Sequence, residues 1–213
     1  MTNCSSKQEK KTRRHILTAA CVAAFGLMVT TGVRAAHDDD IRAPKVPDIL
    51  EVEDGNEVFL VGHGFGTQNY VCAPSTTSVT GVAFSLFTPQ ATLFDDGGRQ
   101  LITHFFSPNP DEGGVVRVTW EDSTDTSIVW AKLITASTDP GFVDPNAVAW
   151  LKLQRVGSRV GPTGGNTLAV TTFVQRVNTE GGLAPAEGCE ALPDVGKKAF
   201  IPYTADYIFY KRN

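Results

Sequence analysis

The chain has 213 residues, of which 41% are hydrophobic and 20% are charged, with 20 glycines, 12 prolines and 4 cysteines. This composition suits one globular domain with a short additional segment, and it excludes a disordered chain or a disulfide-rich scaffold. The net charge of −4 combines two unlike parts: residues 1–35 carry six basic groups and one acid, whereas residues 36–213 carry 13 basic and 22 acidic groups. The acidic second part lacks the basic stripe that nucleic acids require, so we expect no nucleic-acid partner.

The first 35 residues resemble a signal peptide. A basic segment that ends at Arg14 precedes an uncharged, mostly apolar run over 16–33, and Val33-Arg34-Ala35 supplies the small residues of a cleavage site. An uncleaved membrane anchor is the alternative, because the run reaches the lower length limit for spanning a bilayer. We expect cleavage, a mature chain that begins at Ala36, and no transmembrane segment in that mature chain.

The export route has two possible forms. Arg13-Arg14 followed by Ile16-Leu17 resembles a twin-arginine signal, and an ordinary secretory signal with two adjacent arginines is the alternative. Cys21 does not suit a lipoprotein site, because the preceding residues 18–20 lack the usual leucine. Both routes predict a periplasmic or extracellular protein.

Cleavage would remove Cys4 and Cys21 and leave Cys72 and Cys189. Two cysteines in an exported chain predict one disulfide. A catalytic thiol or a metal-binding pair is the alternative, but neither cysteine has a Cys or His neighbour at the spacing of a zinc site. We therefore expect a structural bridge and no metal site.

Residues 36–56 predict an extended, poorly ordered lead-in, and residues 57–213 predict a single β-rich domain. Short apolar runs between Gly, Pro, Asn and Asp are typical of strands, and the segments 95–98 and 161–166 are typical of turns between strands. No long stretch shows a helical apolar period. The predicted class is all-β, either an antiparallel sandwich or a closed barrel. The expected strands are 57–62, 67–72, 81–87, 91–95, 99–105, 115–121, 127–136, 147–156, 167–177, 198–203 and 205–211.

The segment Gly62-His63-Gly64-Phe65-Gly66 follows an apolar strand and imitates the start of a dinucleotide-binding motif. That motif requires a helix next, whose N-terminus binds the pyrophosphate. Here a short strand that ends at Pro74 follows instead, so we expect glycines in a bend between strands and no nicotinamide cofactor. The sequence identifies no other cofactor.

Catalytic motifs are weak in this sequence. His63 and His104 survive cleavage outside the lead-in, but no spacing brings them together, and no Gly-x-Ser-x-Gly elbow occurs. The paired acids at 95–96 and 121–122 fall at predicted turns. If the protein is an enzyme, His104, Asp206 and Arg176 are the residues to test.

Four polar residues predict a binding site: Tyr70, Arg176, Tyr203 and Asp206. Together they would suit a small polar ligand or a sugar. The alternative is structural, with an Arg–Asp pair and tyrosine hydroxyls that tie the C-terminal hairpin to the Cys189 loop.

Six segments carry a family resemblance: 66–72, 87–94, 149–153, 173–179, 184–189 and 202–207. Together they resemble the exported family called Domain of Unknown Function 3455, over residues 44–211. The resemblance implies that Cys72 and Cys189 belong to the family pattern, and it brings no established activity, cofactor or catalytic residue. Some fungal relatives carry a malate dehydrogenase label, which the glycine motif and the all-β prediction argue against extending to this chain.

The main functional hypothesis is therefore a non-enzymatic exported β-domain that binds a small ligand or a surface polymer, or has a structural part in the envelope. The alternative is an extracytoplasmic hydrolase that acts on carbohydrate or another polymer. A closed barrel with an apolar interior would favour a hydrophobic ligand.

Overall fold

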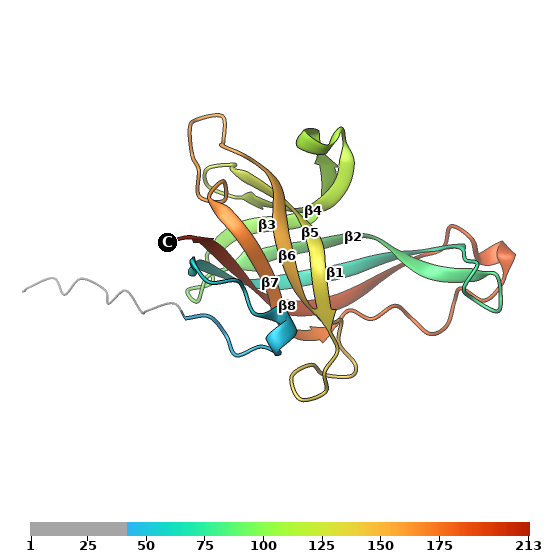
Figure 1. Cartoon of the computed structure of the whole chain (residues 1–213). Helices are drawn as coiled ribbons and strands as arrows, with labels where there is room; N and C mark the ends of the chain where they lie inside the picture. The colour runs from blue at the N-terminus through green and yellow to red at the C-terminus, as the bar shows by residue number, and fades with distance from the viewer. Residues whose placement is uncertain (1–41) are drawn as a thin grey trace, which may run out of the picture. The chain divides into compact units, whose positions relative to one another are not determined.

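The computed structural model describes residues 42–213, so the predicted signal peptide and the first part of the lead-in lie outside the described residues. Eight antiparallel strands form a closed barrel, in which each strand pairs with the next and β8 pairs back with β1 (Figure 1). The strands are β1 (Asn56–Pro74), β2 (Val82–Phe94), β3 (Gln100–Asn109), β4 (Val115–Asp122), β5 (Ile128–Ser137), β6 (Trp150–Arg159), β7 (Thr171–Gly181) and β8 (Lys198–Arg212).

The all-β prediction is confirmed, and of the two architectures the protein adopts the barrel. The described helices are three short 3-10 turns, η1 (Asp48–Leu50), η2 (Pro110–Glu112) and η3 (Leu192–Asp194). Over residues 42–213, no helix has the length and apolarity needed to cross a bilayer.

The glycine segment lies inside one continuous strand rather than in a bend between two. Strand β1 runs through the predicted strands 57–62 and 67–72 without interruption. A Cβ atom added to Gly64 would lie 2.9 Å from the ring of Tyr207, and one added to Gly66 would overlap the carbonyl oxygen of Gln90. These glycines are therefore needed for close packing against neighbouring strands, and no helix follows to bind a dinucleotide.

Two further pairs of predicted strands are also continuous. Strand β2 combines 81–87 with 91–95, and β8 combines 198–203 with 205–211. Pro89 is tolerated within β2 because β3 begins to pair with β2 only at Ala91, so Pro89 has a partner strand on the β1 side alone.

Strands β1, β2 and β8 extend together beyond the barrel (Figure 1). We call this extension, formed by residues 69–74, 82–89 and 198–202, the arm. The predicted disulfide is confirmed: Cys72 of the arm bonds to Cys189, 117 residues later in the chain. The bridge fixes the loop that precedes β8 to the arm, and the backbone supports it, because Cys72 N donates to Lys197 O at 2.8 Å.

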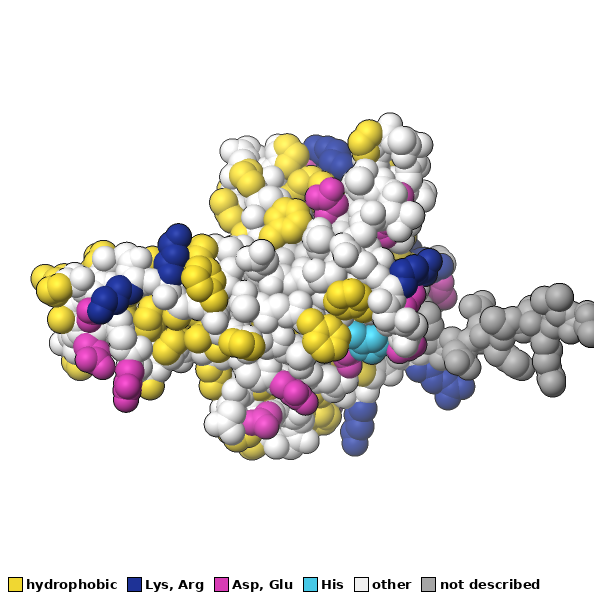
Figure 2. Space-filling model, turned by 180° about the vertical axis from the view of Figure 1, so that it is seen from behind, with side chains coloured by type: hydrophobic (Ala, Val, Ile, Leu, Met, Phe, Trp, Pro, Cys, Tyr) yellow, Lys and Arg dark blue, Asp and Glu magenta, His cyan; other side chains and the backbone are white. Residues whose placement is uncertain are grey.

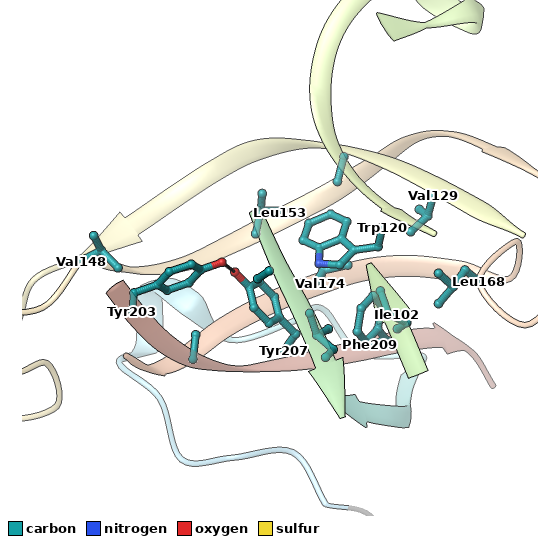
Figure 3. Close-up of a cluster of buried hydrophobic side chains, with 14 residues drawn as sticks. Ile102, Trp120, Val129, Val148, Leu153, Leu168, Val174, Tyr203, Tyr207 and Phe209 are labelled. Carbon is teal, nitrogen blue, oxygen red and sulfur yellow. Dashed lines mark hydrogen bonds between the residues drawn. The ribbon is translucent and has the colours of Figure 1, made fainter. Parts of the chain in front are cut away.

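One end of the barrel interior is filled by large apolar side chains. Figure 3 shows Val148 and Tyr203 at one end of this cluster and Val129 and Leu168 at the other, with Trp120 between them. Trp120, Val129 and Leu168 are fully buried. Trp120 of β4 points into this cluster, whereas Val116 of the same strand is exposed.

The described part of the lead-in packs on the outer face of the barrel. Val46 and Leu50 are buried there in a second apolar cluster that includes Trp150 and Tyr210. Gln175 Nε2 donates to Leu50 O at 2.7 Å, and this bond holds η1 against β7. Residues 42–55 are thus a packed strap, because their apolar side chains cover positions of the sheet that point away from the interior.

Replacing Gly66 with Ala should destabilise the fold, because the new methyl group would overlap the backbone of β2. We expect a loss of about 1–3 kcal/mol in the free energy of unfolding, the usual cost of overpacking. Gly97→Ala is the control, since a Cβ there would meet only the flexible carboxylate of Asp95 at 3.2 Å. Denaturant unfolding of both variants measures the difference, and equal midpoints would contradict the prediction.

Candidate functional site: a cavity at one end of the barrel

A cavity of about 590 Å³ lies at one end of the barrel interior, and Trp120, Val148, Leu153 and Tyr207 of the apolar cluster form part of its wall. All eight strands contribute side chains to its wall, and the loop between β5 and β6 covers part of its mouth. The wall is mainly apolar, with residues such as Phe106, Val118, Leu151 and Leu153. A cavity of this volume and lining is typical of sites for one small molecule.

Arg176 is the cation of this wall. It lies on β7 between Gln175 and Val177, which are buried on the outer side of the barrel, and its own side chain points inward. Its Nε and Nη2 atoms both donate to Ala149 O, at 3.2 and 2.7 Å. Among the described residues no carboxylate forms an ion pair with it, so its charge is available to an occupant of the cavity.

Two other wall residues carry buried hydrogen-bond donors without a partner. These are Nε2 of Gln68 and Nε1 of Trp120. Gln68 lies close enough to the Tyr203 hydroxyl to lower its pKa somewhat, against the larger opposite effect of burial, but its Nε2 makes no hydrogen bond. An unpaired buried donor costs about 1–3 kcal/mol, so both groups would gain from a ligand acceptor.

His104 is a neutral, packed part of the wall. Its ring stacks on Trp120 with a centroid distance of 4.7 Å, and its Nδ1 atom lies 2.9 Å from Thr119 O. Because a carbonyl oxygen only accepts, Nδ1 carries the proton and donates it to Thr119. Burial, together with the charge of Arg176, lowers the pKa of His104 to about 3, so the ring stays uncharged at neutral pH.

Three tyrosines lie at the same end of the barrel. The Tyr203 and Tyr207 hydroxyls are hydrogen-bonded at 2.9 Å, and Figure 3 shows them pointing toward each other. Tyr70 donates to Gly182 O at 2.6 Å. Burial raises the pKa of all three hydroxyls, so they remain protonated. Tyr70 and Tyr207 line the cavity directly, and Tyr203 supports Tyr207 from the apolar cluster.

Asp206 lies on the opposite side of the wall. Ala205 and Tyr207 point into the barrel, so Asp206 between them points outward. There its Oδ1 is 2.7 Å from Nδ1 of His63, and its Oδ2 accepts from Asn178 at 2.7 Å. Figure 2 shows a histidine on this surface beside acidic side chains. The other ring nitrogen of His63, Nε2, is 2.9 Å from Asp96.

The structure thus brings Tyr70, Arg176 and Tyr203 to one end of the interior and separates Asp206 from them. The expected Arg176–Asp206 pair does not form, since the guanidinium bonds to Ala149 and the carboxylate to His63 and Asn178. His104, Asp206 and Arg176, the residues to test in an enzyme, likewise do not meet, because Asp206 is outside.

Neither Gln68 nor the apolar rim of the cavity is identified as part of a site from the amino-acid pattern alone. Gln68 could have been placed inward by continuing the alternation of Gly62, Gly64 and Gly66 along β1, had the segment been recognised as one strand. The rim residues Leu133 and Leu183 gave no signal, because isolated exposed leucines are common in any protein.

Comparison with protein families identifies the chain. The model of the family described as Protein of unknown function (DUF3455) matches residues 53–211, which is most of the chain. The protein therefore belongs to this family, and the resemblance seen in the sequence is confirmed. Searches of curated proteins and of solved structures found no match.

The two described histidines should affect stability in opposite directions with pH. His104 is neutral in the folded protein down to a pKa of about 3, whereas in the unfolded chain it protonates near 6.5. The stabilising effect of the neutral His104 ring is therefore complete above pH 6.5. Below that pH, the free energy of unfolding falls by up to about 1.4 kcal/mol for each pH unit. The variant His104→Asn keeps a donor for Thr119 without the titration, so its stability should fall less than that of the wild type between pH 7 and 5, as measured by denaturant unfolding at each pH.

His63 provides the opposite control. The hydrogen bond to Asp206 is the main cause of the raised pKa of His63. His63 therefore stabilises the fold fully below its pKa in the unfolded chain, and this stabilisation is lost as the pH rises through its pKa in the folded protein. In His63→Gln the loss of stability on acidification should therefore be larger than in the wild type. Parallel pH profiles for the wild type and both variants would contradict this assignment.

Proposed function

We propose that this member of the DUF3455 family is an exported, non-enzymatic binding protein that holds one small, mainly apolar molecule inside its barrel. The observation that carries the proposal is the cavity of about 590 Å³, to which all eight strands contribute. Its wall is apolar apart from a few polar groups, which is the usual arrangement of a small-molecule site.

The contrast between the two ends of the interior also supports binding. Around Leu93, Ile102 and Phe209 the interior is packed with no exposure, as a purely structural barrel requires. An empty apolar space costs stability in proportion to its volume, so a structural domain gains nothing from a cavity at the other end. A ligand that fills the cavity would recover those contacts.

The mouth of the cavity is suited to an apolar molecule. Three leucines both line the cavity and remain exposed to solvent: Leu86 at 38%, Leu133 at 53% and Leu183 at 44%. Apolar side chains that rim an opening mark a binding surface more often than isolated exposed ones do. They would contact an apolar ligand as it passes from solvent into the barrel.

The hydrolase alternative has less support from the two described histidines. Both ring nitrogens of His63 lie within hydrogen-bond distance of carboxylates, so neither is free to take a proton from a nucleophile or a water molecule. His104, with its pKa lowered to about 3 mainly by burial, is a weak base at neutral pH. Neither histidine therefore has the arrangement of a general base.

Export is the second part of the proposal. The Cys72–Cys189 bridge supports it, because disulfides persist in oxidising compartments such as the periplasm and the extracellular space. The basic and apolar pattern of residues 1–35 is the other support.

Mass spectrometry of the protein recovered from the periplasm or culture medium of its own host should find Ala36 at or near the N-terminus. Cytoplasmic protein from a host with blocked export serves as the control and should keep the residues before Ala36. Exported protein that retains Met1 would contradict cleavage, and protein found only in the cytoplasm would contradict export.

Binding can be tested with N-phenyl-1-naphthylamine, a neutral apolar fluorophore whose emission rises in apolar surroundings. It should bind the mature chain saturably. The double variant Val118→Trp/Leu151→Trp fills part of the cavity and should raise the Kd by about tenfold or more, because the added rings occupy the space of the probe.

The matched control is Val116→Trp/Val160→Trp, which adds the same rings at exposed positions outside the cavity. This control should bind the fluorophore as the wild type does. A saturable signal that both double variants reduce equally, or no signal from the wild type, would overturn the proposed function.

A further inference from the structure

The two charged side chains that line the cavity lie in different parts of it. Of the residues that line it, Arg176 supplies a positive charge and Asp144 supplies the carboxylate. Asp144 lies in the mouth loop, where its Oδ1 accepts from the backbone N of Asn146 at 2.7 Å. His104 adds no charge, because it is neutral. The inner wall therefore presents one cation without a counter-charge.

The charge of Arg176 is energetically unfavourable in the wall when no ligand is bound. Arg176 is partly buried, and its hydrogen bonds go to neutral groups, Ala149 O and the Tyr207 hydroxyl. A partly buried charge is normally retained because it is paired, and none of the described residues provides the pair. Hydrogen bonds to a carbonyl and a hydroxyl could be made by a neutral side chain, so the charge of the guanidinium points to an anionic partner that is not part of the chain.

The two buried donors without a partner also favour a ligand that accepts hydrogen bonds. Gln68 is almost fully buried and lines the cavity, and its Nε2 has no acceptor. Trp120, also fully buried and lining the cavity, has an unpaired Nε1. Guanidinium, amide and indole N–H groups all donate, so the group that would satisfy them is an acceptor such as a carboxylate.

We propose that the occupant is an amphiphile with a single carboxylate head, held at Arg176 and Gln68, and a hydrocarbon body that extends along the apolar wall toward the mouth. This inference rests on the proposed binding function and adds the chemical class of the ligand. The apolar residues Leu86, Leu133 and Leu183 at the mouth would contact the hydrocarbon. A carboxylate can accept from the N–H groups of Nη1 and Nη2 that are not used on Ala149.

Isothermal titration calorimetry of the mature protein at neutral pH tests this with three probes of equal chain length: decanoate, 1-decanol and decylamine. Decanoate should bind at least about tenfold more tightly than decanol, since hydrogen bonds to a charged group contribute about 1.5–3 kcal/mol. Decylamine, a cation beside Arg176, should bind most weakly.

Arg176→Met should remove the preference for decanoate over decanol. The matched control is Arg155→Met, which also removes an arginine that donates to a backbone carbonyl, Ala169 O, but lies outside the cavity lining. This control should keep the preference. Arg176→Lys, which keeps the charge but not the guanidinium N–H groups, should retain part of it.

Gln68→Leu tests the second donor without relying on Arg176. Because Gln68 Nε2 has no partner in the fold, the variant should unfold at the same denaturant concentration as the wild type or a higher one. Its affinity for decanoate should fall several-fold, and its affinity for decanol should stay the same. If the affinities for decanoate and decanol fall equally, Gln68 does not bind the carboxylate head.

The outcomes separate this inference from the function on which it rests. If decanoate and decanol bind equally and Val118→Trp/Leu151→Trp weakens both, the cavity binds apolar molecules and the carboxylate assignment is overturned. If the preference survives in Arg176→Met, the role of Arg176 is overturned. If neither probe nor the neutral fluorophore binds, the proposed function itself fails.

Discussion

Closure of the barrel depends on the close approach that glycine permits along the inner face of β1. This strand pairs with β2 on one side and with β8 on the other, and its pairing with β8 joins the last strand of the barrel to the first. A Cβ at Gly62 would lie 3.0 Å from Leu93, and one at Gly64 would lie 2.9 Å from the Tyr207 ring. The missing side chains make room for these two large ones, and the sheet can curve enough for its first and last strands to meet.

The same packing determines where the interior is full and where it is hollow. Once Leu93 and Tyr207 occupy the space beside the glycines, the end beyond Trp120 is sealed by apolar side chains. At the other end β1 carries Gln68 and Tyr70, whose polar groups lie at the wall of a cavity. The bridge between Cys72 and Cys189 holds the arm just beyond this end, so the covalent link and the cavity belong to one region of the fold.

Much of this fold could be predicted from residues alone, and the errors have one physical origin. The turn at 95–98 and the disulfide depend on local pattern or on cysteine count, and the structure has both. Glycine and proline were interpreted as breaks in β1 and β2, because their local propensity disfavours strands. Their effect depends instead on which strand lies opposite, and that is known only once the whole barrel is closed.

The separation of Arg176 from Asp206 shows the same limit at the candidate site. Arg176 is opposite Tyr207 in the ladder between β7 and β8, and Asp206 is opposite Val177, so a shift of one residue in this register would place Arg176 and Asp206 on the same face. With the observed register, Asp206 bonds to His63 and Asn178 on the outside and strengthens the seam with β1. The Asp206 carboxylate therefore bonds on the outside of the wall, and the charge of Arg176 on the inside has no carboxylate beside it. The register between β7 and β8 thus determines that the inner wall of the cavity carries the positive charge of Arg176.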